Sequence, residues 1–135
     1  MTIEDIRQGL ETRLAAIESL RVQQEWGENP NVSGGACVAV VEYDGTTLAA
    51  LKNAAHDIQF KVTVLASKVS DRAGRQKLDV LAEHTDNAVG SVRTAVQGIV
   101  NGTHYCYVES NTGYREYPIG EQAYLGVEFV LSVAA

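Results

Sequence analysis

The final segment of the chain has the clearest pattern of apolar and polar positions. Residues 122–133 alternate at a period of two, which is typical of a β-strand. One face of this segment is entirely apolar and carries Leu125, Val127, Phe129, Leu131 and Val133. The other face is mixed, so the pattern predicts a strand of an antiparallel sheet that packs on one side. We expect this strand either inside a sheet or at an edge that meets another chain, because open apolar edges promote association.

Shorter segments of the same kind predict the remaining strands. They span residues 20–26, 36–43, 58–67 and 103–109. The second of them is apolar on both faces as far as Glu42, which predicts a position in the interior of the sheet. The third shows the clearest alternation, which only Leu65 interrupts.

Turn-forming residues predict where these strands end. Asp44 and Gly45 are expected to open one turn, and residues 111–113 (NTG) another. Residues 114–117 are a candidate for pairing with a neighbouring strand. Residues 118–120 (PIG) then turn the chain into the final strand.

Apolar residues that recur every three or four positions predict a helix over residues 2–19. Its apolar stripe consists of Ile3, Ile6, Leu10, Leu14 and Ile17. Thr2 is a suitable N-cap, because Asp5 follows three residues later in the spacing of a capping box. Such a stripe requires a partner surface, and a sheet is the expected one.

Two further helices are predicted after the third strand. One begins at Ser70 or Asp71 and runs to about His84, with Leu78 and Leu81 on its apolar side. The other covers residues 92–100, and Ser91 is its N-cap. The intervening sequence contains polar residues and a glycine that separate the two.

Residues 46–57 fit two different structures. Their alanines and leucines favour two turns of helix, and a mobile loop fits equally well.

The elements together predict a single domain over residues 1–135. Its class is α+β, with a mostly antiparallel sheet of four or five strands and helices packed on one face.

Charge and composition limit the classes of function. The chain has 135 residues and a formal net charge of −6, which argues against a free nucleic-acid-binding protein because such proteins carry basic patches. The first residues are polar and acidic and no apolar run approaches about 18 residues, so we expect neither a signal peptide nor a membrane-spanning helix. The cytosol, or an assembly built there, is the expected location. Cys37 and Cys106 are then expected to be buried thiols rather than a disulfide.

The residue types that carry catalysis do not form a recognisable motif. His56, His84 and His104 are scattered and lack the spacing of a metal site. Ser91 follows a glycine but lacks the pattern of a nucleophile elbow, so a role as a helix cap is favoured. We therefore assign no catalytic residue, no metal site and no cofactor, and we do not expect an enzyme.

Two features are candidates for contacts with other proteins. Five tyrosines lie close together in the sequence: Tyr105, Tyr107, Tyr114, Tyr117 and Tyr124. They fit the face of an amphipathic sheet and a protein interface, where tyrosine is enriched, equally well. The second feature is a basic run in an acidic chain, Arg72, Arg75 and Lys77, for which a solvated helix face is favoured over a partner site.

Three segments occur in an order that carries a resemblance. The first is IQFKVTVL at residues 58–65, followed after four residues by SDRA at 70–73. The second is GSVRTAV at 90–96, and the third is YPIG at 117–120 with YLGVEF at 124–129. In this order and spacing they resemble the tail terminator proteins of phages with long, non-contractile tails, especially those of actinobacterial hosts.

The resemblance implies a structural role in a virion, without a reaction or a cofactor. Such proteins are small α+β subunits that form a homo-hexameric ring, which caps the growing tail tube and stops its polymerisation. The implied partners are identical subunits, the major tail tube protein and the head-completion or connector protein, and no membrane is involved. DNA is expected to pass through an acidic lumen without specific binding, because like charges remove the counterion-release attraction. The implied location is the head-proximal end of the virion tail, after assembly in the host cytoplasm.

Three segments supply candidate assembly contacts, at residues 46–57, 72–77 and 114–124. The candidates are Leu48, Leu51, Lys52, Arg72, Arg75, Lys77, Tyr114, Tyr117, Ile119 and Tyr124. Two alternatives remain open. One is a neck or head-completion connector protein at the same joint. The other belongs to a different class: a small-ligand-binding α+β domain or enzyme, with the tyrosines between residues 105 and 124 as its pocket.

Overall fold

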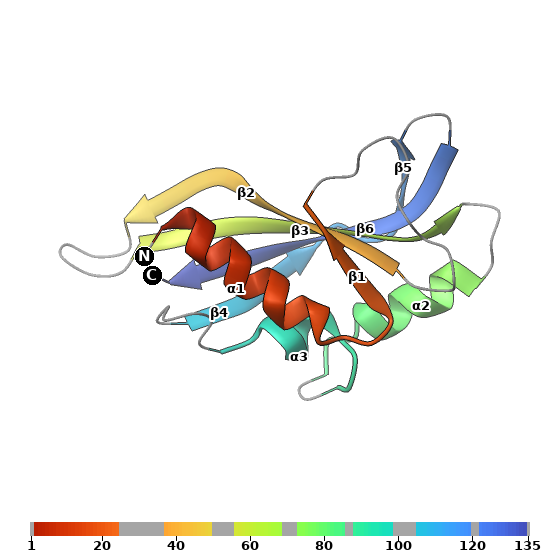
Figure 1. Cartoon of the computed structure of the whole chain (residues 1–135), viewed down its shortest axis with the longest axis horizontal. Coiled ribbons are helices and arrows are strands. Elements are labelled where there is room, and N and C mark those ends of the chain that lie inside the picture. The colour runs from red at the N-terminus through yellow and green to blue at the C-terminus, as the bar shows by residue number, and fades with distance from the viewer. Residues whose placement is uncertain are drawn as a thin grey trace.

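The computed structural model describes residues 2–24, 37–49, 56–68, 73–85, 88–98, 105–119 and 122–134. Its elements are α1 (Ile3–Ala15), β1 (Leu20–Gln23), β2 (Cys37–Ala49), β3 (His56–Lys68), α2 (Ala73–Leu81), α3 (Val92–Val96), β4 (Tyr105–Asn111), β5 (Arg115–Ile119) and β6 (Gln122–Ala134) (Figure 1). The α+β class is confirmed. The predicted number of four or five strands is wrong, because the described residues form a sheet of six.

The sheet is mixed but mostly antiparallel. Its strand order is β1-β2-β3-β6-β4, and β5 also pairs with β6. Only β1 and β2 run parallel among the paired strands of the described chain. Strand β6 therefore lies inside the sheet, with β3 along one edge and both β4 and β5 along the other. Of the two positions expected for the final strand, inside the sheet or at an exposed edge, the structure shows the position inside the sheet.

Strands β4 and β5 follow one another along the same edge of β6. Asn111 pairs with Phe129 at the end of β4, and Arg115 pairs with Gly126 at the start of β5. The turn predicted at residues 111–113 consequently kinks the chain and does not reverse it. Gly113 has a φ of 76°, and its N–H donates to Asn111 Oδ1 at 2.9 Å, which closes the local loop. The strand pairing predicted for residues 114–117 is confirmed, and it extends to Ile119.

Strand β2 is longer than the sequence pattern predicts. It continues to Ala49, so the turn expected at Asp44 and Gly45 is wrong. The register with β3 shifts between Tyr43 and Thr47, where the irregularity takes up these turn-forming residues. Residues 46–49 and 56–57 belong to strands, which excludes helix and loop for them, and residues 50–55 lie outside the described chain.

Helix α1 begins as predicted. Thr2 Oγ1 accepts from the N–H of Asp5, and the Asp5 carboxylate accepts from the N–H of Thr2, both at 3.1 Å. This capping box satisfies two donors that would otherwise lack partners at the helix start. The stripe predicted from the sequence is buried in its central part, at Ile6, Leu10 and Leu14. The helix ends at Ala15, four residues before the predicted end.

Helices α2 and α3 are shorter than predicted. Leu78 and Leu81 of α2 are buried as expected, but the helix ends at Leu81 and not near His84; its expected start at Ser70 or Asp71 lies outside the described residues. Ser91 caps α3, since its Oγ accepts from the N–H of Thr94 at 3.1 Å. Helix α3 ends at Val96 because Gly98, with a φ of 107°, turns the chain into a backbone bridge with Cys106.

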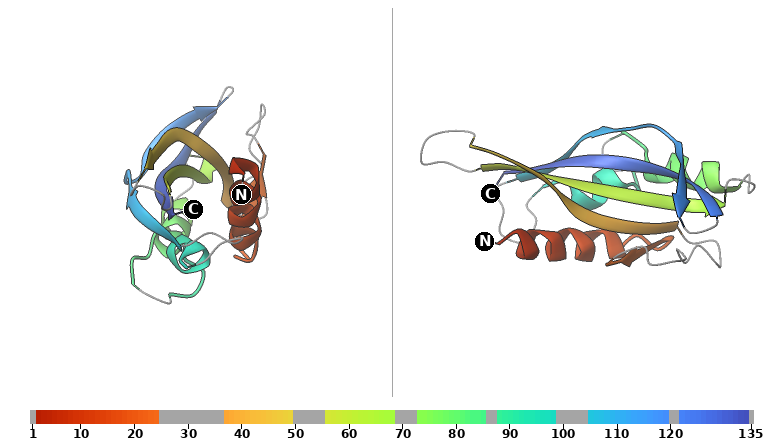
Figure 2. Two further views of the ribbon diagram at one scale, coloured as in Figure 1. Left: turned by 90° about the vertical axis from the view of Figure 1, so that its left-hand side faces the viewer. Right: turned by 90° about the horizontal axis from the view of Figure 1, so that it is seen from above.

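One hydrophobic core joins the three helices to the sheet. Its members include Ile6, Leu10 and Leu14 from α1, Leu78 and Leu81 from α2, and Phe60, Phe129 and Leu131 from the sheet. Helix α1 contacts β1, β2 and α3, while α2 contacts β3 and β6. Figure 2 shows the curved sheet with α1 running along one side of it. Cys37 and Cys106 lie in this core as free thiols, as predicted.

Candidate assembly surfaces

The structure separates the predicted assembly residues into different environments. Leu51, Lys52 and Arg72 lie outside the described residues. Leu48 occupies the outer part of β2, where its backbone pairs with Asp57 of β3. The contact role proposed for these four residues stays a prediction.

The tyrosine cluster does not form one surface. Tyr124 is only 3% exposed because β6 is flanked by β3 and β5, so its side chain packs within the subunit and is not available to a partner. Tyr114 and Tyr117 are half-buried at the junction of β5 with the rest of the domain. Tyr105 and Tyr107 are 43% and 45% exposed.

Tyr105 and Tyr107 form an exposed aromatic pair on β4. Their ring centroids are 6.2 Å apart and the ring planes are tilted by 39°, which is a favourable arrangement of aromatic rings. Gln97 Nε2 donates to the Tyr105 hydroxyl at 3.2 Å and fixes the direction of that ring. The candidate list drawn from the sequence omitted this pair. Their alternation with buried Cys106 is the signal that places both rings on one face.

Tyr114 connects β5 to helix α2. Its hydroxyl donates to Asp79 Oδ1 at 2.5 Å, a contact between residues far apart in the sequence. Burial raises the pKa of the Tyr114 hydroxyl well above its usual value, and the hydrogen bond to the Asp79 carboxylate raises it further. Arg75 lies near enough to act in the opposite direction on that pKa. Tyr114 is therefore a protonated donor that holds the start of β5 against α2.

The β5–β6 hairpin depends on a close approach at Gly126. A Cβ at this position lies 2.5 Å from the carbonyl oxygen of Val64, 2.7 Å from Leu65 Cδ2 and 3.0 Å from Tyr117 Cδ2. No other residue fits there without movement of its neighbours. Tyr117 pairs with Tyr124 across the hairpin, and burial raises the pKa of its hydroxyl. Ile119, paired with Gln122, ends β5 as a half-buried residue.

Arg75 of α2 has an acidic residue, Asp79, one turn further along the same helix. Arg75 is exposed and Lys77 is half-buried. Asp79 follows on the same helix and accepts the Tyr114 hydrogen bond. Arg75 is thus an exposed cation beside the Asp79 carboxylate, which already accepts a hydrogen bond from Tyr114.

One face of the sheet carries Glu42, Lys61 and Glu128 in its middle, while Val38, Val40 and Leu65 on the same face are buried. Lys61 Nζ lies 4.0 Å from a carboxylate oxygen of Glu42 and 4.0 Å from one of Glu128, which joins β2, β3 and β6 in one row. Gln59 Nε2 donates to Glu109 Oε2 at 3.1 Å in the neighbouring region of the sheet. These exposed ion pairs stabilise the fold weakly. They leave an excess of carboxylates on this face.

Two hydroxyl groups and two thiols of the described residues have structural roles. Ser91 serves as a helix cap, and the Ser132 hydroxyl donates to Asp57 across neighbouring strands. Burial raises the pKa of the Cys106 thiol to about 12 and raises that of Cys37. Within the described residues, no group of three or more His, Cys, Asp or Glu side chains is placed to hold a metal ion.

No helix in the described part of the chain is long and apolar enough to cross a membrane. A comparison with protein-family models gives no match, and a comparison with curated proteins gives none at a significant level.

Proposed function

We propose that the protein is a structural subunit of a phage tail, a tail terminator that forms a hexameric ring at the end of the tail tube. The ring stops polymerisation of the tube and joins it to the head. The ordered set of three segments that resembles this family carries the proposal. The described residues of these segments lie in β3, at the start of α2, in α3 and in the β5–β6 hairpin.

The way these segments meet supports a single structural unit. Segment 58–65 lies in β3 and pairs with residues 126–133 of the final strand, where Val64 faces Val127. Segment 90–96 contains the Ser91 cap and α3, whose Val92 and Val96 enter the common core. The described residues of segments 117–120 and 124–129 belong to the β5–β6 hairpin, and the two segments meet where Tyr117 pairs with Tyr124. We further propose that all three helices cover one face of the sheet, which the common core supports.

With the helices on one face, the other, more polar face of the sheet is available to line the ring. Its middle row includes the carboxylates of Glu42 and Glu128, with Lys61 between them. In a ring, this middle part of the face is suited to a lumen through which DNA passes, since an acidic wall offers no counterion-release attraction.

The direct test is arrest of tail-tube growth. Purified tube protein of the same phage is polymerised with and without the chain, and tube lengths are measured by electron microscopy. We expect shorter tubes with six-fold density at one end when the chain is present. Tubes of unchanged length without density at their ends contradict the proposal. A sample of the chain with Phe129→Asp, which is expected to be unfolded, is the matched control.

Two alternatives are separated by further measurements. A neck or head-completion protein is expected to bind the connector and to leave tube length unchanged. A small-ligand-binding domain is expected to melt at higher temperature with its ligand, whereas a ring subunit melts at higher temperature as its own concentration rises.

A further inference from the structure

The described chain exposes few large apolar side chains. They are Val80, Val89, Tyr105 and Tyr107. Only the two tyrosines touch one another and lie on a regular strand, on the polar face of the sheet. Exposed rings of this kind are typical of protein contacts, since an aromatic side chain buries a large area at low conformational cost.

Backbone pairing between copies is disfavoured at the edge of the sheet that β4 and β5 form. Gly98 exchanges two backbone hydrogen bonds with Cys106, at 2.9 and 2.7 Å, and so covers the outer edge of β4 there. Pro118 removes an N–H from β5, which forms the rest of this edge. The opposite edge consists of β1, which has only four residues, and of the part of β2 beyond Val40 that β1 does not cover. An interrupted edge limits strand addition, so a contact between copies at the β4–β5 edge would use side chains.

The surroundings of the tyrosine pair are acidic. Across the sheet, Tyr105 faces Ala134, which in turn faces Asp57. Tyr107 similarly leads through Ser132 to Gln59, whose amide binds the exposed Glu109. Lys61 follows Gln59 on this face of β3, and it already lies between two carboxylates. We define Tyr105, Tyr107, Asp57 and Glu109 as the acidic aromatic patch.

The other end of the molecule carries two exposed arginines. Arg75 lies on α2, and Arg115 begins β5. Neither forms an ion pair with another of the described residues. Asp79 beside Arg75 accepts the Tyr114 hydroxyl, and Glu116 alternates to the opposite side of β5 from Arg115. We define Arg75 and Arg115 as the arginine pair.

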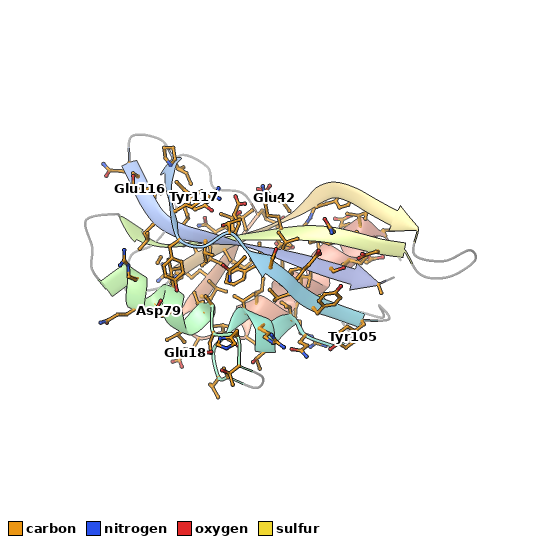
Figure 3. The ribbon with its side chains drawn as sticks, turned by 180° about the vertical axis from the view of Figure 1, so that it is seen from behind. Glu18, Glu42, Asp79, Tyr105, Glu116 and Tyr117 are labelled. Atoms are coloured by element: carbon orange, nitrogen blue, oxygen red, sulfur yellow. The ribbon has the colours of Figure 1, made fainter. Side chains whose placement is uncertain are left out.

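The two groups lie toward opposite ends of the long axis. Figure 3 shows Tyr105 toward one end, while Asp79 of α2 and Glu116 of β5 lie toward the other. Opposite charges at two different places on one chain fit a head-to-tail contact between copies. Repetition of such a heterologous contact closes a ring when the rotation permits it, whereas a contact of a patch with itself stops at a dimer.

We propose that the acidic aromatic patch of one copy binds the arginine pair of the next. Arginine suits this patch because its guanidinium binds carboxylates and stacks on aromatic faces. The proposal rests on the ring of the proposed function and assigns its subunit contact.

The test uses two variants of the full chain, each disabled at one surface. In the first variant, Tyr105→Ser and Tyr107→Ser remove the two rings of the acidic aromatic patch. In the second, Arg75→Glu and Arg115→Glu reverse the charge of the arginine pair. All four positions are exposed, so both variants are expected to keep the wild-type melting temperature at low concentration. Val89→Ser, at a position that is 94% exposed, is the matched apolar control and is expected to assemble normally.

Native mass spectrometry and light scattering over a range of concentrations give the outcome. The wild type is expected to form closed oligomers, and each variant alone is expected to associate at least about tenfold more weakly. A one-to-one mixture of the two variants is expected to form dimers and nothing larger, because each retains one intact surface. Added salt is expected to weaken the contact.

Three results overturn the inference. They are a wild type that stays monomeric at every concentration, a variant that assembles as well as the wild type, and a mixture that does not dimerise. None of these results decides the proposed function, which the tube-growth experiment tests separately. Conversely, oligomers that form through these surfaces but leave tube growth unchanged support the contact and contradict the terminator role.

Discussion

Replacement of Gly126 by alanine is expected to destabilise the protein, although such a change often has the opposite effect. Gly126 lies in β6 and is not one of the described glycines that have a positive φ. At positions of that kind, alanine stabilises a protein by about 0.4–1 kcal/mol because it restricts the unfolded chain. The space around the residue therefore decides the sign.

The structure leaves no room for a methyl group at this position. The nearest atom to the added Cβ is the backbone carbonyl oxygen of Val64, at 2.5 Å. This oxygen belongs to β3, which pairs with β6 over nearly its whole length, so it is not able to rotate away as a side chain does. Overpacking of this kind costs about 1–3 kcal/mol. That loss is a large part of the 5–15 kcal/mol or so that stabilises a typical domain.

Urea denaturation followed by circular dichroism measures the effect. We expect Gly126→Ala to lower the free energy of unfolding by about 1–3 kcal/mol with an unchanged m-value. In a Leu65→Val background the loss is expected to be smaller but still present, because only the contact at 2.7 Å with Leu65 Cδ2 is relieved. An unchanged or increased stability of Gly126→Ala refutes the steric argument.

Other substitutions and one chemical probe test the remaining parts of the structure. Phe129→Asp is expected to abolish cooperative unfolding, because it places an unpaired charge in the core, while Leu125→Asp is expected to be milder since Leu125 is only half-buried. Thr2→Ala is expected to lower the free energy of unfolding by about 1 kcal/mol through loss of the N-cap, and an unchanged urea midpoint contradicts this. Cys37 and Cys106 are expected to react with a thiol reagent only after unfolding, because burial raises both pKa values and shields both sulfur atoms. Rapid labelling of the native protein at pH 8 contradicts their placement in the core.

The tyrosines show how burial changes the interpretation of a sequence cluster. Tyr105 and Tyr124 fit the same description in the sequence, as aromatic residues of alternating strands. Their environments differ because β4 forms part of an edge of the sheet, whereas β6 has neighbours on both sides. Exposure therefore makes Tyr105 and Tyr107 better candidates for a contact than the hairpin tyrosines.

The sequence by itself determined the elements whose signals are local. The period of two in β3 and β6 and the period of about 3.6 in α1 follow from which side chains must avoid water. The caps at Thr2 and Ser91 are equally local, because each hydroxyl binds a backbone N–H three residues later. The α+β class follows from these elements and needed no knowledge of their partners.

Only the tertiary structure decided what depends on partners distant in sequence. Strand β2 continues past Asp44 and Gly45 because β3 offers hydrogen bonds to its outer part, and these outweigh the preference of those residues for a turn. Strands β4 and β5 share one edge of β6, and Tyr114 meets Asp79, through contacts that no local pattern encodes. Exposure, and with it the choice of contact residues, is a property of the assembled sheet, since it depends on which neighbours cover each side chain.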